Sequence, residues 1–195
     1  MTPGAAFFEA VVGGTDPAVV SEAADRAATL LVRGARESGD AEVASRIVHL
    51  VDTEGLETLA DLWAGAPAET LAGCLWRLYV LRAWVYADPA LAARQFEAGR
   101  ASAQVARVVS GVADPPGPDG LRVMVDQVLA GIVTGDFADV LLRAAAFARV
   151  VAAGRAHLHQ AGEGEQAGHD DTARMLSLAE QMEHAGHLEL RGELG

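Results

Sequence analysis

Apolar residues recur along this chain every three or four positions, which is the spacing of one face of an α-helix. The clearest example is the segment 68–87, where five apolar side chains form one stripe: Leu71, Leu75, Leu78, Leu81 and Val85. A second stripe on the same segment contains Trp76, Val80 and Trp84. Because two stripes imply contacts on most sides, the pattern predicts that this segment is the central helix of the fold.

The same periodicity predicts other helices before and after this segment, at 4–12, 17–37, 41–52, 56–64, 89–112, 119–134 and 137–158. Asp88 precedes a proline and Asp136 follows a glycine, so each aspartate is expected to cap the helix that it precedes. No segment alternates strictly between polar and apolar residues, so no sheet is expected. The sequence therefore predicts an all-α fold, a compact bundle of seven or eight helices around 68–87.

The character of the chain changes near its C-terminus. Residues 160–170 are rich in Gly, Glu and Gln and offer little to bury, which predicts a flexible linker between a helical domain at 1–159 and a C-terminal amphipathic helix at 171–195. A tethered amphipathic helix needs an apolar groove, either on its own domain or on a second copy of the chain. The residues expected at such an interface are Met175, Leu178, Met182 and Leu188.

The apolar segment 71–87 is not expected to span a membrane, although it is the most hydrophobic part of the chain. It contains Arg77 and Arg82, and each arginine near the centre of a span costs about 2.5–3.5 kcal/mol on insertion scales. Each leucine or valine recovers only about 0.3–0.6 kcal/mol, so the balance is unfavourable.

Composition and charge narrow the functional classes. The chain has 27 acidic and 15 basic residues and a formal net charge of −12, and every basic residue is an arginine. This charge opposes phosphate binding, so we expect no nucleic-acid partner. The excess of Ala and Gly and the absence of Lys are typical of a high-GC bacterial genome. The single cysteine, Cys74, and an N-terminus without a secretory pattern favour a cytoplasmic protein.

Aromatic and arginine residues suggest one kind of binding site. A small apolar acid would fit a pocket whose aromatic walls bury the apolar part and whose guanidinium holds the carboxylate. Alternatively, these arginines pair with carboxylates of the chain itself, as buried arginines usually do. The candidate pocket residues are Trp63, Trp76, Arg77, Tyr79, Arg82, Trp84 and Phe96.

Histidines suggest a second kind of site, because five of the six lie in the last forty residues. His184 and His187 are three residues apart and share one face of a helix, so they are candidate metal ligands. The motifs of helical metalloproteases and di-iron bundles are absent, however, and exposed histidines on a polar helix explain the pattern equally well.

No catalytic motif is recognisable, and we expect neither enzymatic activity nor a cofactor. The sequence favours a non-catalytic, self-associating protein-interaction module, with a homo-oligomer as the expected state. The alternatives are a helical domain that binds a small apolar acid and a metal-binding protein.

Overall fold

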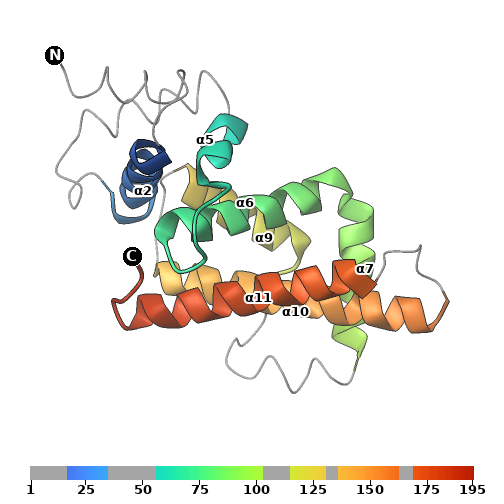
Figure 1. Cartoon of the computed structure of the whole chain (residues 1–195). Helices are drawn as coiled ribbons and strands as arrows, with labels where there is room; N and C mark the ends of the chain where they lie inside the picture. Colours follow the sequence, from blue (N-terminus) through green and yellow to red (C-terminus); the bar gives the residue numbers. More distant parts are fainter. Residues whose placement is uncertain (1–16, 35–55, 103–114, 131–135, 163–168) are drawn as a thin grey trace, which may run out of the picture. The chain divides into compact units, whose positions relative to one another are not determined.

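The computed structural model describes residues 17–34, 56–102, 115–130, 136–162 and 169–195 (Figure 1). These residues form seven α-helices and no strand, which confirms the all-α prediction. The helices predicted at 4–12 and 41–52 lie outside the described residues. None of the described helices combines the length and the apolar character needed to cross a bilayer.

Contacts divide the chain into two units, of which one comprises residues 1–76, 127–134 and 195. In this unit, α2 (Pro17–Arg33) packs against α5 (Leu56–Trp63). Trp63 is fully buried and donates a hydrogen bond from Nε1 to the carbonyl of Ala24 at 3.2 Å. Helix α2 was predicted to reach residue 37, but it ends at Arg33 because Gly34 adopts a left-handed conformation with φ of 77°.

The second unit comprises residues 77–126 and 135–194 and contains α7 (Pro89–Ala101), α10 (Phe137–Gln160) and α11 (His169–Leu190). Helix α10 packs against both α7 and α11, and α10 and α11 lie side by side (Figure 1). Most residues of α10 are buried, and most of these are alanines and valines. Helix α10 therefore forms the core of this unit. Helix α11 packs within its own chain, and residues 163–168 of the predicted linker lie outside the described residues.

One boundary between the two units falls within α6 (Leu71–Ala87), after residue 76. Another falls within α9 (Pro118–Leu129), after residue 126. The first predicted stripe of α6 is confirmed, because all five of its side chains are buried. The second stripe is buried only in part: Trp76 and Trp84 are half-buried, and Val80 is 37% exposed. The second stripe is therefore less buried than its spacing predicts, and the difference is greatest at Val80.

Capping groups explain where several helices begin and end. Asp88 accepts a hydrogen bond from the backbone N–H of Leu91 at 2.9 Å, and Asp136 accepts one from Ala138 at 3.0 Å, so both predicted caps are confirmed. Helix α6 starts three residues later than predicted, because the Thr70 hydroxyl caps it by accepting from the N–H of Gly73 at 3.0 Å.

The C-terminal ends of α7 and α9 also differ from the predictions. Helix α7 ends at Ala101 instead of continuing towards residue 112, because Ser102 is extended and turns its N–H and hydroxyl to the carbonyl of Gly99. Helix α9 ends at Leu129, before the predicted 134.

Candidate functional site

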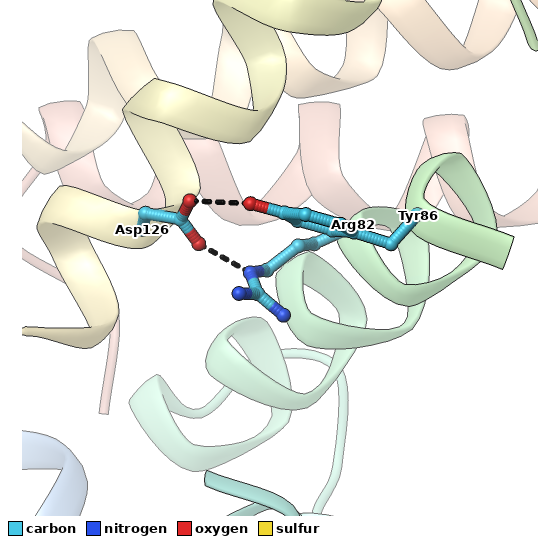
Figure 2. A network of polar contacts seen from close by, with 3 residues as sticks. All are labelled: Arg82, Tyr86 and Asp126. Atoms are coloured by element: carbon cyan, nitrogen blue, oxygen red, sulfur yellow. Dashed lines mark hydrogen bonds and ion pairs between the residues drawn. The ribbon is translucent and has the colours of Figure 1, made fainter. Parts of the chain in front are cut away.

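Tyr86 lies near the C-terminal end of α6 and is joined to α9 by a shared carboxylate (Figure 2). Its hydroxyl donates a hydrogen bond to Oδ2 of Asp126 at 2.8 Å, and Nε of Arg82 donates to Oδ1 of the same carboxylate. Arg82 and Tyr86 are four residues apart, so the helix places them on one side. One aspartate of α9 therefore orients two side chains of α6, all within the second unit.

Two guanidinium groups lie against the Tyr86 ring. The Cζ atom of Arg82 is 4.3 Å from the ring centroid, and that of Arg122 is 4.1 Å from it. Both distances lie within the range of cation–π contacts, which contribute about 0.5–1 kcal/mol each at exposed sites. Tyr86 is nevertheless 40% exposed. The ring is thus held in place by its neighbours and still accessible to a partner.

Arg122 has a weaker set of partners than Arg82. Its Nη1 lies 3.3 Å from Oδ1 of Asp119, whose side chain is 95% exposed. Its Nε is buried and has no hydrogen-bond partner within the described part of the chain. The Tyr86 hydroxyl raises the pKa of Arg122, and Asp119 and Asp126 contribute to the same effect. Because an arginine guanidinium stays protonated in proteins, Arg122 is a permanent positive charge at this surface.

Spacing along α9 places four side chains on one face of the helix. Arg122, Val123 and Asp126 follow Asp119 by three, four and seven residues, which is the repeat of a single helical face. Val123 is 59% exposed. We call four side chains of this region the Tyr86 surface: the exposed Tyr86, Asp119 and Val123, and the partly buried Arg122.

The hydrogen bonds of the cluster hold its side chains in defined orientations. Both oxygens of Asp126 accept hydrogen bonds, and the adjacent Arg82 is always charged. Each of the two oxygens therefore already accepts a hydrogen bond from a side chain of α6. The arrangement therefore fixes the Tyr86 hydroxyl and ring in one direction.

A second arginine, Arg155 of α10, connects three other elements of the same unit. Its Nε donates to Oε1 of the buried Gln95 at 2.8 Å, and its Nη1 donates to the backbone oxygen of Asp171 at 2.9 Å. Its Cζ lies 4.9 Å from the ring centroid of Trp84. Burial lowers the pKa of Arg155, and Asp171 partly opposes this effect. All of these contacts stabilise helix packing.

The structure brings together some of the predicted pocket residues. Trp84 and Phe96 both pack on Phe147, with ring centroids 6.4 Å and 5.4 Å from the Phe147 centroid. These three rings belong to the second unit, whereas Trp63 and Trp76 belong to the first. Tyr79 is half-buried.

The two candidate arginine anchors have partners inside the protein. Nε of Arg77 donates to Oε1 of Gln181 at 2.7 Å, and Arg82 pairs with Asp126. For Arg82, the structure therefore agrees with the alternative interpretation, in which the arginine pairs with a carboxylate of the chain itself.

His184 and His187 are both exposed on α11. In the part of the chain that the structure describes, no three His, Cys, Asp or Glu side chains form a group that could hold a metal ion.

The predicted interface residues of the C-terminal helix take part in packing within the chain. Met175 and Met182 are buried, and Leu178 and Leu188 are half-buried. The pairing of Arg149 in α10 with Glu183 in α11 accompanies this contact. The apolar face of α11 is therefore largely occupied by α10.

Sequence reasoning missed the Tyr86 surface. The spacing of Arg82 and Tyr86 on one helix was visible, and an internal carboxylate partner was among the alternatives. However, no local pattern connects these residues to Asp126, which lies forty residues further along the chain.

Comparison of this chain with protein-family models, with curated proteins and with solved structures gives no match.

Proposed function

We propose that this chain is a self-associating helical interaction module and that the Tyr86 surface is its contact region. The observation that carries the proposal is that Tyr86 is 40% exposed although two arginines and one aspartate hold it in place. Protein interfaces are enriched in tyrosine and arginine, which often dominate their binding energy.

Preorganisation of these side chains supports the proposal. Association orders flexible side chains at a cost of about 0.5–1.5 kcal/mol for each one that becomes immobilised. Tyr86 is already fixed by Asp126, and Arg122 already lies against the ring. A partner that docks here therefore loses less conformational entropy than it would on a surface of mobile side chains.

Exposed apolar groups supply the second contribution. Among the described residues, five large hydrophobic side chains are substantially exposed, and two of them, Tyr86 and Val123, belong to the Tyr86 surface. Burial of one valine side chain contributes about 1.5–3 kcal/mol. Val123, at 59% exposed, would give up its remaining exposed surface in a contact.

We also propose that the protein is located in the cytoplasm of a bacterium. The single cysteine, Cys74, is buried in the fold, and a lone buried thiol is compatible with a reducing compartment. The arginine-only basic composition supports a bacterial source.

Sedimentation equilibrium over a wide range of protein concentration tests the proposal. We expect the mass to rise with concentration to that of a dimer, and we expect Val123→Gln to weaken dimerisation by about tenfold or more, because the apolar contact is lost. The matched control is Leu190→Gln, since Leu190 on α11 is also 59% exposed.

A wild-type chain that stays monomeric at every concentration would refute the proposal. Equal weakening by the Val123 and Leu190 substitutions would show that the contact does not lie at the Tyr86 surface.

A further inference from the structure

The Tyr86 surface has one positive and one negative side chain, Arg122 and Asp119, which lie about one helical turn apart on α9. Arg122 and Asp119 face each other in α9 at 3.3 Å, with side-chain exposures of 30% and 95%. Because Asp119 is almost fully exposed, water screens this pair, and it contributes little to the stability of the monomer. Both groups can therefore exchange their partner within the chain for one on another molecule.

Symmetry makes such a surface complementary to itself. In a two-fold dimer the same patch faces its own copy. If residue i of the first copy contacts residue j of the second, then residue j of the first copy also contacts residue i of the second. A patch with a single sign of charge would repel itself in this arrangement. A patch with an arginine and an aspartate side by side forms two ion pairs instead.

We infer that the partner at the Tyr86 surface is a second copy of this chain, with Arg122 of each copy paired to Asp119 of the other around Val123 and Tyr86. This inference rests on the proposed function and adds the register of the contact.

Arg122 is suited to this role by its position. Its guanidinium lies 4.1 Å from the centroid of the Tyr86 ring, so its direction is fixed before binding. Arg82, the other guanidinium on the ring, is paired with Asp126 inside the protein. Of these two arginines, Arg122 has the weaker carboxylate partner, at 3.3 Å from an almost fully exposed aspartate.

Complementary charge reversal tests the inference. Arg122→Asp places two aspartates on each copy of the patch, and Asp119→Arg places two arginines on each copy. We expect each variant alone to dimerise at least about tenfold more weakly than the wild type, because both ion pairs become repulsive. An equimolar mixture of the two variants should recover dimers, since every contact between unlike variants is attractive. The double variant carrying both substitutions should also recover them.

The chain offers a matched control on another helix. Asp171 and Arg174 in the first turns of α11 have the same spacing, lie 3.5 Å apart and are exposed. Asp171→Arg and Arg174→Asp change the net charge by the same amounts as the variants of the Tyr86 surface. Both should leave the dimerisation constant within about twofold of the wild-type value. Circular dichroism verifies that each variant keeps its helix content.

The outcomes separate the inference from the proposed function. If the wild type dimerises but the mixture of variants does not recover dimers, the register is wrong and the self-association proposal stands. If the wild type stays monomeric but a basic protein binds at Asp119, the partner is heterologous and the inference is overturned. If a charge-reversed variant loses helix content, Asp119→Asn and Arg122→Gln replace it, and unchanged dimerisation by both would overturn the inference.

Discussion

At the scale of single residues, Asp126 decides how Tyr86 is presented. Its two carboxylate oxygens accept from the Tyr86 hydroxyl and from Arg82, so one side chain of α9 fixes two side chains of α6. Hydrogen bonds that involve a charged group contribute about 1.5–3 kcal/mol, and exposure to water reduces this value. Asp126 is 39% exposed, so a reduced contribution is expected.

We expect Asp126→Ala to lower the free energy of unfolding by about 1–2 kcal/mol, because Arg82 and the Tyr86 hydroxyl both lose their acceptor. Tyr86→Phe removes only the hydroxyl and should cost less, about 0.5–1 kcal/mol. Urea unfolding followed by circular dichroism measures both values. Equal effects of the two substitutions would mean that the Arg82 contact contributes nothing.

At the scale of helices, the crossing of α7 and α10 depends on two glycines. A Cβ atom on Gly154 would lie 1.8 Å from the backbone oxygen of Gln95, and one on Gly99 would lie 1.9 Å from the oxygen of Val150. The two backbones therefore touch directly, and no side chain fits between them. Arg155 then ties the same crossing to Gln95.

Gly154→Ala is expected to destabilise the protein by about 3 kcal/mol, at the upper end of the usual cost of overpacking, because the clash is with backbone that cannot rotate away. Gly65→Ala is the control, since a Cβ there meets no atom within 4 Å, and it should change stability by less than about 0.5 kcal/mol. A thermal melt monitored by circular dichroism distinguishes the two. Similar melting temperatures for both variants would contradict the close crossing.

Helix positions could be predicted from the sequence because they depend on local periodicity. All seven described helices overlap predicted ones, and the caps at Asp88 and Asp136 follow from local chemistry. Several helix ends were misplaced because they depend on local conformations that apolar spacing does not reveal, such as the left-handed Gly34 and the extended Ser102.

The candidate site could be predicted only in part. Arg82 was recognised as an arginine in need of a partner, but its pairing with Asp126 joins helices distant in sequence. The exposure of Val80 was also missed, because its apolar spacing in α6 is the same as that of buried residues. Periodicity shows which residues share a face, and it does not show what covers that face.

At the scale of the whole molecule, charge opposes the self-association that we propose. Each copy has a formal net charge of −12, so two copies repel each other at long range. The local pairs between Arg122 and Asp119 act only at contact. Dimerisation therefore depends on how strongly salt screens the net repulsion.

We expect dimerisation to strengthen several-fold when ionic strength rises from about 0.01 to 0.15 M, because the screening length falls from about 30 to 8 Å. Binding of a basic partner would weaken over the same range, since its attraction is screened instead. Sedimentation equilibrium at constant pH measures the trend. A dimer that weakens steadily with added salt would show that attraction between opposite charges dominates the contact.

The most direct test of the central claim is a dilution series followed by two-dimensional amide NMR. The proposed contact predicts concentration-dependent shifts at Tyr86, Arg122 and Val123, with none on the exposed side of α11 around Leu176. Shifts confined to α11, or spectra that do not change with concentration, would contradict the claim that the Tyr86 surface joins two copies of this chain.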